Sequence, residues 1–94
     1  MAIAVVMDFV GGTTALYDEV LKKMELRHGG PGGPGALFHW VAKTDKGITV
    51  TDVWKSKEAF EKFSDDKIKP ISAAVGMPQP KVQFHEIYNY LTAN

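Results

Sequence analysis

The chain has 94 residues, of which 45% are hydrophobic, 11% aromatic and 23% charged, as expected for one globular domain spanning residues 1–94. Eleven basic residues balance eleven acidic ones, so the chain lacks the positive excess that favours nucleic acid or an anionic membrane as partner. The absence of cysteine excludes a disulfide scaffold, an Fe–S cluster, a thiolate zinc site and a cysteine nucleophile. Small-molecule chemistry or protein binding remains.

The chain begins with a predicted strand. Residues 2–9 form an almost wholly apolar run, closed by Gly11 and Gly12, which is typical of a strand covered on both faces. No basic segment precedes this run, and Asp8 interrupts it, so it predicts neither a signal peptide nor a membrane span. We therefore expect a cytoplasmic protein.

A helix is predicted next, with the hydroxyl of Thr13 or Thr14 as its N-cap. Basic residues crowd its last turn, where they suit the helix dipole, so the helix should end near His28 with Gly29 as its cap. We interpret His28 as a surface residue. The inward stripe repeats at four-residue spacing, with two further apolar residues beside it: Leu16, Val20 and Met24, then Tyr17 and Leu21.

The glycine- and proline-rich segment 29–35 is predicted to be a mobile connector. Glycine-rich loops that bind phosphate run from a strand into a helix, whereas this one leaves a helix and enters a strand. Residues 36–43 and 48–54 then predict a hairpin, in which Gly47 could supply the positive φ of a bulged turn.

The second helix should start at the cap Ser56 and end before Pro70, and a further short turn should end at Gly76. Residues 81–90 predict the last strand. The resulting order, β-α-β-β-α-β, predicts an α+β, ferredoxin-like fold with both helices on one face of a four-stranded antiparallel sheet. Because the strands are apolar on both sides, the open face should pack face to face against a second copy in a homodimer.

The segment Val-Trp-Lys-Ser-Lys-Glu-Ala-Phe, residues 53–60, resembles a motif of the dimeric α/β-barrel superfamily, within its antibiotic-biosynthesis-monooxygenase-like group. The resemblance implies a ferredoxin-like subunit whose sheet joins that of a second subunit to form a barrel. It also implies a small-molecule enzyme such as a cofactor-independent monooxygenase or an isomerase. Fold alone does not fix the reaction.

A resemblance to the haem-degrading branch of this superfamily would require an Asn on the first strand, together with a Trp and a haem-ligating His on the second helix. This chain offers Asp8 on the first strand and Phe63 at the matching helix position, and no histidine lies between His39 and His85. Haem degradation is therefore disfavoured, and we expect no cofactor. Three histidines without a short-spaced pair also predict no metal site.

His39 and Asp52 are the candidate catalytic residues. A hairpin loop of four residues places them directly opposite each other, where the carboxylate could orient the imidazole as a general base inside a largely apolar barrel. A three-residue bulged loop instead pairs Asp52 with Trp40 and His39 with Val53. The alternative interpretation is that both residues are structural.

Aromatic residues are the candidates for binding a planar substrate. Either His85 or Glu86 should join them, because neighbours on a strand face opposite sides. The competing interpretations are a plain core or dimer interface for the aromatics, and a non-catalytic dimeric ligand-binding module for the whole protein. The candidate substrate-binding residues are Phe38, Trp40, Trp54, Phe84, His85 and Tyr88.

Overall fold

The computed structural model describes residues 1–91. Within this range the elements follow the predicted β-α-β-β-α-β order, and the second helical region consists of three consecutive segments. The elements are β1 (Ile3–Val10), α1 (Thr14–Lys23), β2 (Ala36–Thr44), β3 (Gly47–Trp54), α2 (Lys57–Phe63), the π-helical turn η1 (Ser64–Ile68), α3 (Lys69–Val75) and β4 (Lys81–Glu86).

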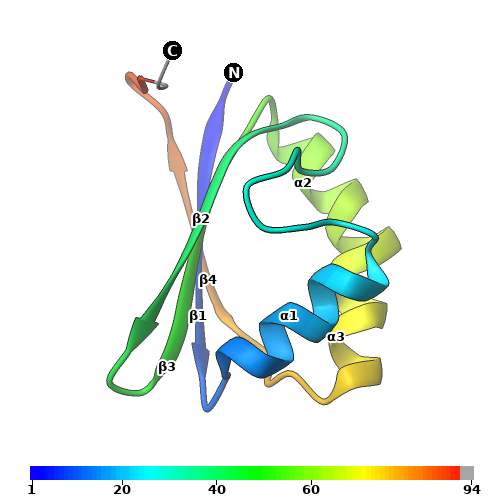
Figure 1. Cartoon of the computed structure of the whole chain (residues 1–94). Helices are drawn as coiled ribbons and strands as arrows, with labels where there is room; N and C mark the ends of the chain where they lie inside the picture. Colours follow the sequence, from blue (N-terminus) through cyan, green and yellow to red (C-terminus); the bar gives the residue numbers. More distant parts are fainter. Residues whose placement is uncertain (92–94) are drawn as a thin grey trace.

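The four strands form one antiparallel sheet in the order β2-β3-β1-β4. All helices lie on one face of this sheet, and the opposite face carries no helix (Figure 1). The predicted α+β, ferredoxin-like architecture is thereby confirmed. No helix within residues 1–91 has the length and apolar character needed to cross a membrane.

Alternation along the strands divides the sheet into two faces. The helix-facing residues of β1 are Ile3, Val5, Met7 and Phe9, all buried, whereas the residues between them are more exposed. The helix-facing side chains of β1 and β3 form one core with residues of the helices. The core comprises Ile3, Val5, Met7, Phe9, Val20, Ile48, Val50, Trp54, Phe60 and Met77.

Helix α1 ends at Lys23, so the prediction of an end near His28 with Gly29 as cap was wrong. Glu25 adopts a left-handed conformation with φ 61°, and the Leu26 N–H donates to the Leu21 carbonyl at 2.9 Å. This pattern of hydrogen bonds is that of a Schellman cap, in which glycine usually holds the left-handed position. The chain therefore turns away from the helix four residues before Gly29.

The second helix, α2, ends at Phe63, before Pro70 as predicted, and η1 joins it to α3, whose first turn contains Pro70. In the turn η1, the N–H of Lys69 donates to the carbonyl of Ser64, five residues earlier. Because Pro70 has no N–H to donate, a wider turn just before it lets α3 start without that bond. Gly76 has φ +82° and caps α3 as predicted.

The β2–β3 hairpin differs from the prediction in its turn and in a register shift between Ala36 and Phe38. The strands pair up to Thr44 and Gly47, and Gly47 does not have a positive φ. Glycine is needed here for a close approach instead, since a Cβ would lie 2.1 Å from the carbonyl oxygen of Phe9. Strand β4 ends at Glu86, four residues earlier than predicted.

Replacing Glu25 with glycine should stabilise the protein. A residue with a side chain loses about 1 kcal/mol in the left-handed region, and glycine loses none of it. We expect Glu25→Gly to raise the free energy of unfolding by about 1 kcal/mol, which corresponds to roughly 4–8 °C in Tm for a chain of this size. Thermal and urea unfolding measure it. Glu25→Ala, which removes the charge but keeps a Cβ, is the control, and equal stabilisation by both variants would contradict the account.

Candidate active site

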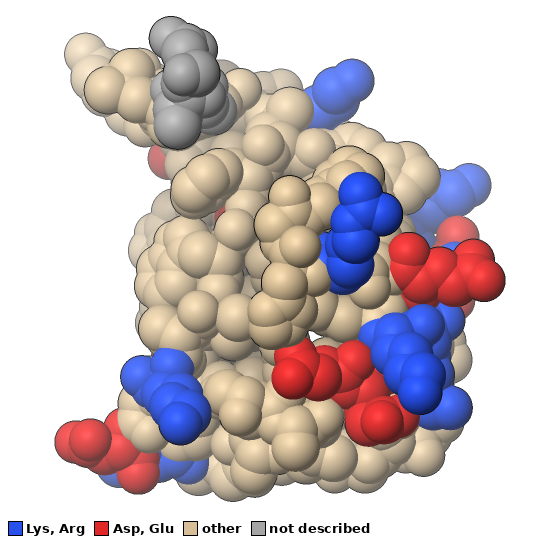
Figure 2. Space-filling model, viewed as in Figure 1, with Lys and Arg blue, Asp and Glu red and all other residues tan. Residues whose placement is uncertain are grey.

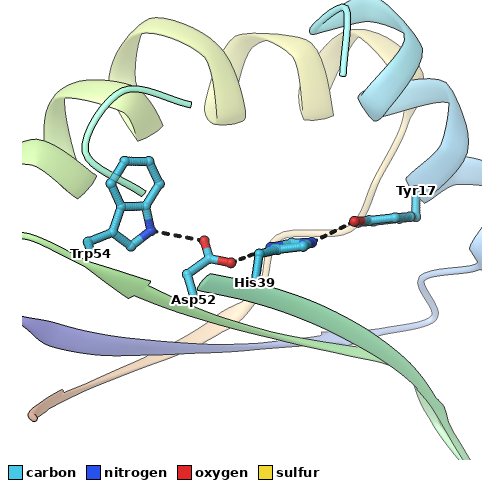
Figure 3. A network of polar contacts seen from close by, with 4 residues as sticks. All are labelled: Tyr17, His39, Asp52 and Trp54. Atoms are coloured by element: carbon cyan, nitrogen blue, oxygen red, sulfur yellow. Dashed lines mark hydrogen bonds and ion pairs between the residues drawn. The ribbon is translucent and has the colours of Figure 1, made fainter. Parts of the chain in front are cut away.

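Four side chains form a continuous hydrogen-bonded chain between the sheet and the helices (Figure 3). The indole N–H of Trp54 donates to Asp52 Oδ2 at 3.1 Å. The other carboxylate oxygen, Oδ1, is bonded to Nδ1 of His39. Nε2 of His39 lies 2.6 Å from the hydroxyl of Tyr17. This series of hydrogen bonds therefore joins strands β3 and β2 to helix α1.

Strand pairing sets the position of the two candidate catalytic residues. His39 on β2 lies directly opposite Asp52 on β3, which confirms the first of the two predicted registers. Asp52 in turn pairs with Val5, and Val5 with Phe84, so these four residues form one row across the sheet. Val5 is fully buried in the core beneath the helices. The row therefore faces the helices.

The site thus lies on the helix side of the sheet, and not on the open face through which two sheets would form a barrel. A cavity of about 760 Å³ occupies this side. Asp52, His39 and Tyr17 line it together with mainly apolar residues of the sheet and α1, and the segment from Arg27 to Gly33 borders it. A cavity of this volume suits a small organic molecule of several rings.

The hydrogen-bond partners determine the protonation of neutral His39. A carboxylate only accepts hydrogen bonds, so Nδ1 must carry the proton that it donates to Asp52. Nε2 then holds a lone pair, which accepts the hydroxyl proton of Tyr17. His39 is therefore oriented with its basic nitrogen toward α1. This is the arrangement that a general base on β2 requires.

Asp52 is almost completely buried, with 5% of its surface exposed. Both of its oxygens are used, one by His39 and one by Trp54. A buried carboxylate is costly unless it is hydrogen-bonded, and within residues 1–91 no buried side-chain nitrogen or oxygen lacks a partner. The indole of Trp54 is itself held by Phe60 and Phe63, whose ring centroids lie at 5.7 and 5.3 Å.

The environment of Tyr17 keeps its hydroxyl protonated. Burial, followed by the negative charges of Asp52 and Asp18, raises the pKa of Tyr17 to about 12. The phenol ring lies in line with the imidazole of His39, with centroids 5.9 Å apart and planes only 9° apart. At neutral pH, Tyr17 is therefore a hydrogen-bond donor to His39.

Among the predicted substrate-binding aromatics, Trp54 lies on the helix side of the sheet with His39 and Asp52, the pair called the dyad below. Phe38 and Trp40 do not. Phe38 pairs with Val53 and Trp40 with Thr51, and these rows alternate with the row of His39. Both residues border the cavity at the edge of the sheet, but the register directs their side chains to the open face. They are about half exposed there, at 47% and 44%.

The other three predicted residues lie away from the dyad. Phe84 faces the helices but packs on Phe60, with centroids 5.7 Å apart, and lies beneath the ammonium group of Lys57. His85 belongs to the open face, because its neighbour Phe84 faces the helices. Tyr88 follows the end of β4 and is fully exposed.

Sequence reasoning missed Tyr17 as a site residue. The signal was its spacing, because Tyr17, Val20 and Met24 lie three and four residues apart on one face of a helix. A polar hydroxyl on an inward stripe needs a buried partner. What that partner is depends on how α1 crosses β2. Within residues 1–91 no group of three or more His, Asp and Glu side chains could hold a metal ion.

The raised pKa of Tyr17 predicts a specific loss of stability in alkali. Folded Tyr17 retains its proton up to about pH 12, whereas an unfolded tyrosine ionises near pH 10. Between these values the folded state binds more protons, so stability falls as pH rises. We expect the urea midpoint to fall more steeply for the wild type than for Tyr17→Phe across this window. Subtracting the two curves removes the shared lysine titration, and parallel curves would contradict the assignment.

No family model matches the chain, and no curated protein matches its sequence. Solved structures do match its fold. Two structures of SnoaB, a cofactor-independent oxygenase from Streptomyces nogalater, one of them a mutant, have TM-scores of 0.62 and 0.60 and sequence identities of 14% and 16%. Each match covers 98% of this chain and 97% of the SnoaB chain.

A third structure is the monooxygenase from the gene ActVA-Orf6 of Streptomyces coelicolor, in complex with nanaomycin D. It has a TM-score of 0.51 and 21% identity over 99% of this chain and 92% of its own. The three matches confirm, over nearly the full chain, the ferredoxin-like subunit fold that the Val-Trp motif implied. The protein therefore shares the ferredoxin-like α+β fold of these solved oxygenase and monooxygenase structures.

Proposed function

We propose that this protein is a cofactor-independent oxygenase that acts on a planar phenolic or α-carbonyl compound, with His39 as the group that accepts the first proton. The observation that carries this proposal is the Asp52–His39 pair at the wall of a largely apolar cavity of about 760 Å³. A base that is oriented by a buried carboxylate is suited to removing a weakly acidic proton.

Each member of the pair has a separate task. Asp52 holds the Nδ1–H of His39 and stabilises the imidazolium that forms when Nε2 takes a proton. Trp54 occupies the second oxygen of Asp52 and so fixes the carboxylate in one orientation. The apolar walls of the cavity would hold the flat substrate and exclude water.

The deprotonated substrate supplies the electrons for the reaction with dioxygen. In the conversion of an acidic methylene group to a carbonyl group, two C–H bonds break and one C=O bond forms. One atom of dioxygen becomes the carbonyl oxygen, and the other leaves as water with the two hydrogens. All the electrons come from the substrate, so the protein has to deprotonate, position and desolvate it. Solved proteins with this fold include a cofactor-independent oxygenase and a monooxygenase.

We also propose that the protein is a homodimer joined through the open faces of two sheets. Phe38, Trp40 and Val10 expose 47%, 44% and 57% of their surface, which is unfavourable for large apolar residues in water. Charged side chains gather over the helices and at the hairpin tip, whereas the flank of the sheet visible in Figure 2 is mostly uncharged. Burying this face against a second copy would remove it from water.

The variant His39→Gln tests the base. Glutamine keeps an amide that can donate to Asp52 but cannot accept a proton, so folding should be preserved while deprotonation is lost. We expect turnover of anthrone, a flat tricycle with an acidic methylene group, to fall by about 100- to 10,000-fold. Oxygen uptake and product formation are measured together, without added flavin or metal, and Tm is measured in parallel.

A second variant, Asp52→Asn, tests the carboxylate that orients His39. Asp65→Asn is its matched control, because Asp65 is an exposed carboxylate on η1 that pairs with Lys69 at 2.9 Å. The control should keep full activity, and Asp52→Asn should lose it. Turnover that continues without oxygen would indicate an isomerase, in which the proton returns to the substrate. Binding of aromatic compounds without any turnover would favour the non-catalytic module, and a large loss of Tm in His39→Gln would assign His39 to structure.

The variant Trp40→Lys tests the dimer. A lysine on the β2 side of the open face would bury an unpaired charge between two sheets, so we expect a monomer. Sedimentation velocity of the wild type should give a dimer. Glu61→Lys, on the exposed face of α2, is the control and should remain dimeric. A monomeric wild type, or a dimeric Trp40→Lys variant, would contradict packing through this face.

A further inference from the structure

Both ring nitrogens of His39 are already occupied. Nδ1 donates to Asp52, and Nε2 lies 2.6 Å from the hydroxyl oxygen of Tyr17. A neutral imidazole has only one lone pair to accept a proton, and this lone pair points at Tyr17. A substrate in the cavity therefore meets the phenol hydroxyl before it meets the basic nitrogen.

The hydroxyl of Tyr17 has capacity left for a substrate. A phenol has one O–H to donate and lone pairs with which to accept. The donor is used on His39, so an acceptor position remains for an acidic hydrogen of a bound molecule. Tyr17 itself lines the cavity. In Figure 3 its ring and the imidazole lie in one line with the carboxylate of Asp52, from α1 across β2 to β3.

Packing holds Tyr17 in this position. Its hydroxyl is bonded to Nε2 of His39 with the two ring planes nearly parallel, and its ring packs against the core cluster. Moving it aside to free Nε2 would lose both contacts. The geometry thus favours passage of a proton through Tyr17 over displacement of Tyr17.

We propose that Tyr17 is a catalytic residue that relays the substrate proton to His39. The substrate X–H bond breaks as its proton moves to the oxygen of Tyr17, while the O–H bond of Tyr17 breaks and its proton moves to Nε2. The substrate is left as an anion, Tyr17 is again a neutral phenol, and His39 becomes an imidazolium facing Asp52. No electron is transferred in this step. The inference rests on the proposed function and adds to it the group that touches the substrate.

The charges around Tyr17 agree with a relay rather than with a free tyrosinate base. Burial, and after it the negative charges of Asp52 and Asp18, oppose a negative charge on the phenol and raise the pKa of Tyr17 to about 12. A tyrosinate would therefore be rare at neutral pH. In the relay, one proton arrives as the other leaves, so the phenol does not accumulate this charge.

The test uses a hydroxyanthraquinone, a planar phenol whose visible spectrum changes when it ionises. The pH titration of this dye is recorded in free solution and when the dye is bound to the wild type or to one of three variants: Tyr17→Phe, His39→Gln and Tyr90→Phe. Tyr90→Phe is the matched control, because it removes a phenol hydroxyl near the C-terminal end of the described chain. Anthrone turnover and Tm are measured for the same four proteins.

We expect the wild type and Tyr90→Phe to ionise the bound dye at a lower pH than in free solution. Tyr17→Phe and His39→Gln should both lose this shift, and their turnover should fall by about 100-fold or more. A Tyr17→Phe variant that keeps the shift and the turnover would overturn the relay and leave His39 as a direct base. A wild type that fails to bind the dye, or binds it without any shift, would instead contradict the proposed function and the relay with it.

Discussion

The buried carboxylate of Asp52 is the group on which the arrangement of the site depends. It lies in the core face of the sheet, where a charge must be hydrogen-bonded on both oxygens to be tolerated. His39 and Trp54 provide these bonds. The same bonds fix the tautomer of the imidazole, the orientation of the indole and, through Nε2, the position of the Tyr17 hydroxyl. One costly burial thus orients three side chains from two strands and a helix.

The two faces of the sheet carry different residues because side chains alternate along each strand. The row of His39 and Asp52 faces the helices and the cavity. The neighbouring rows, with Phe38 and Trp40, face away from the helices and are partly exposed. The candidate site and the face proposed for subunit contact are therefore separated by one residue of register.

Helix α1 completes the cavity because it ends early. The left-handed Glu25 turns the chain after Lys23, and the segment from Arg27 to Gly33 then borders the cavity. On the other side, the π-helical turn lets the second helical region pass through Pro70 without a break. This region supplies Phe60 and Phe63, which hold Trp54 in place.

The sequence by itself determined the order of elements and the ferredoxin-like sheet, and it limited the partner of His39 to Asp52 or Val53, because strand patterns and hairpin pairing are local. The first of these pairings puts the indoles of Trp40 and Trp54 on opposite faces. Only the tertiary structure decided that the site lies on the helix side and that Tyr17 reaches His39. Both depend on how α1 crosses the sheet, which is set by packing between residues far apart in the chain. The end of α1 was mispredicted for a similar reason, because Glu25 takes a backbone conformation that local preference assigns to glycine.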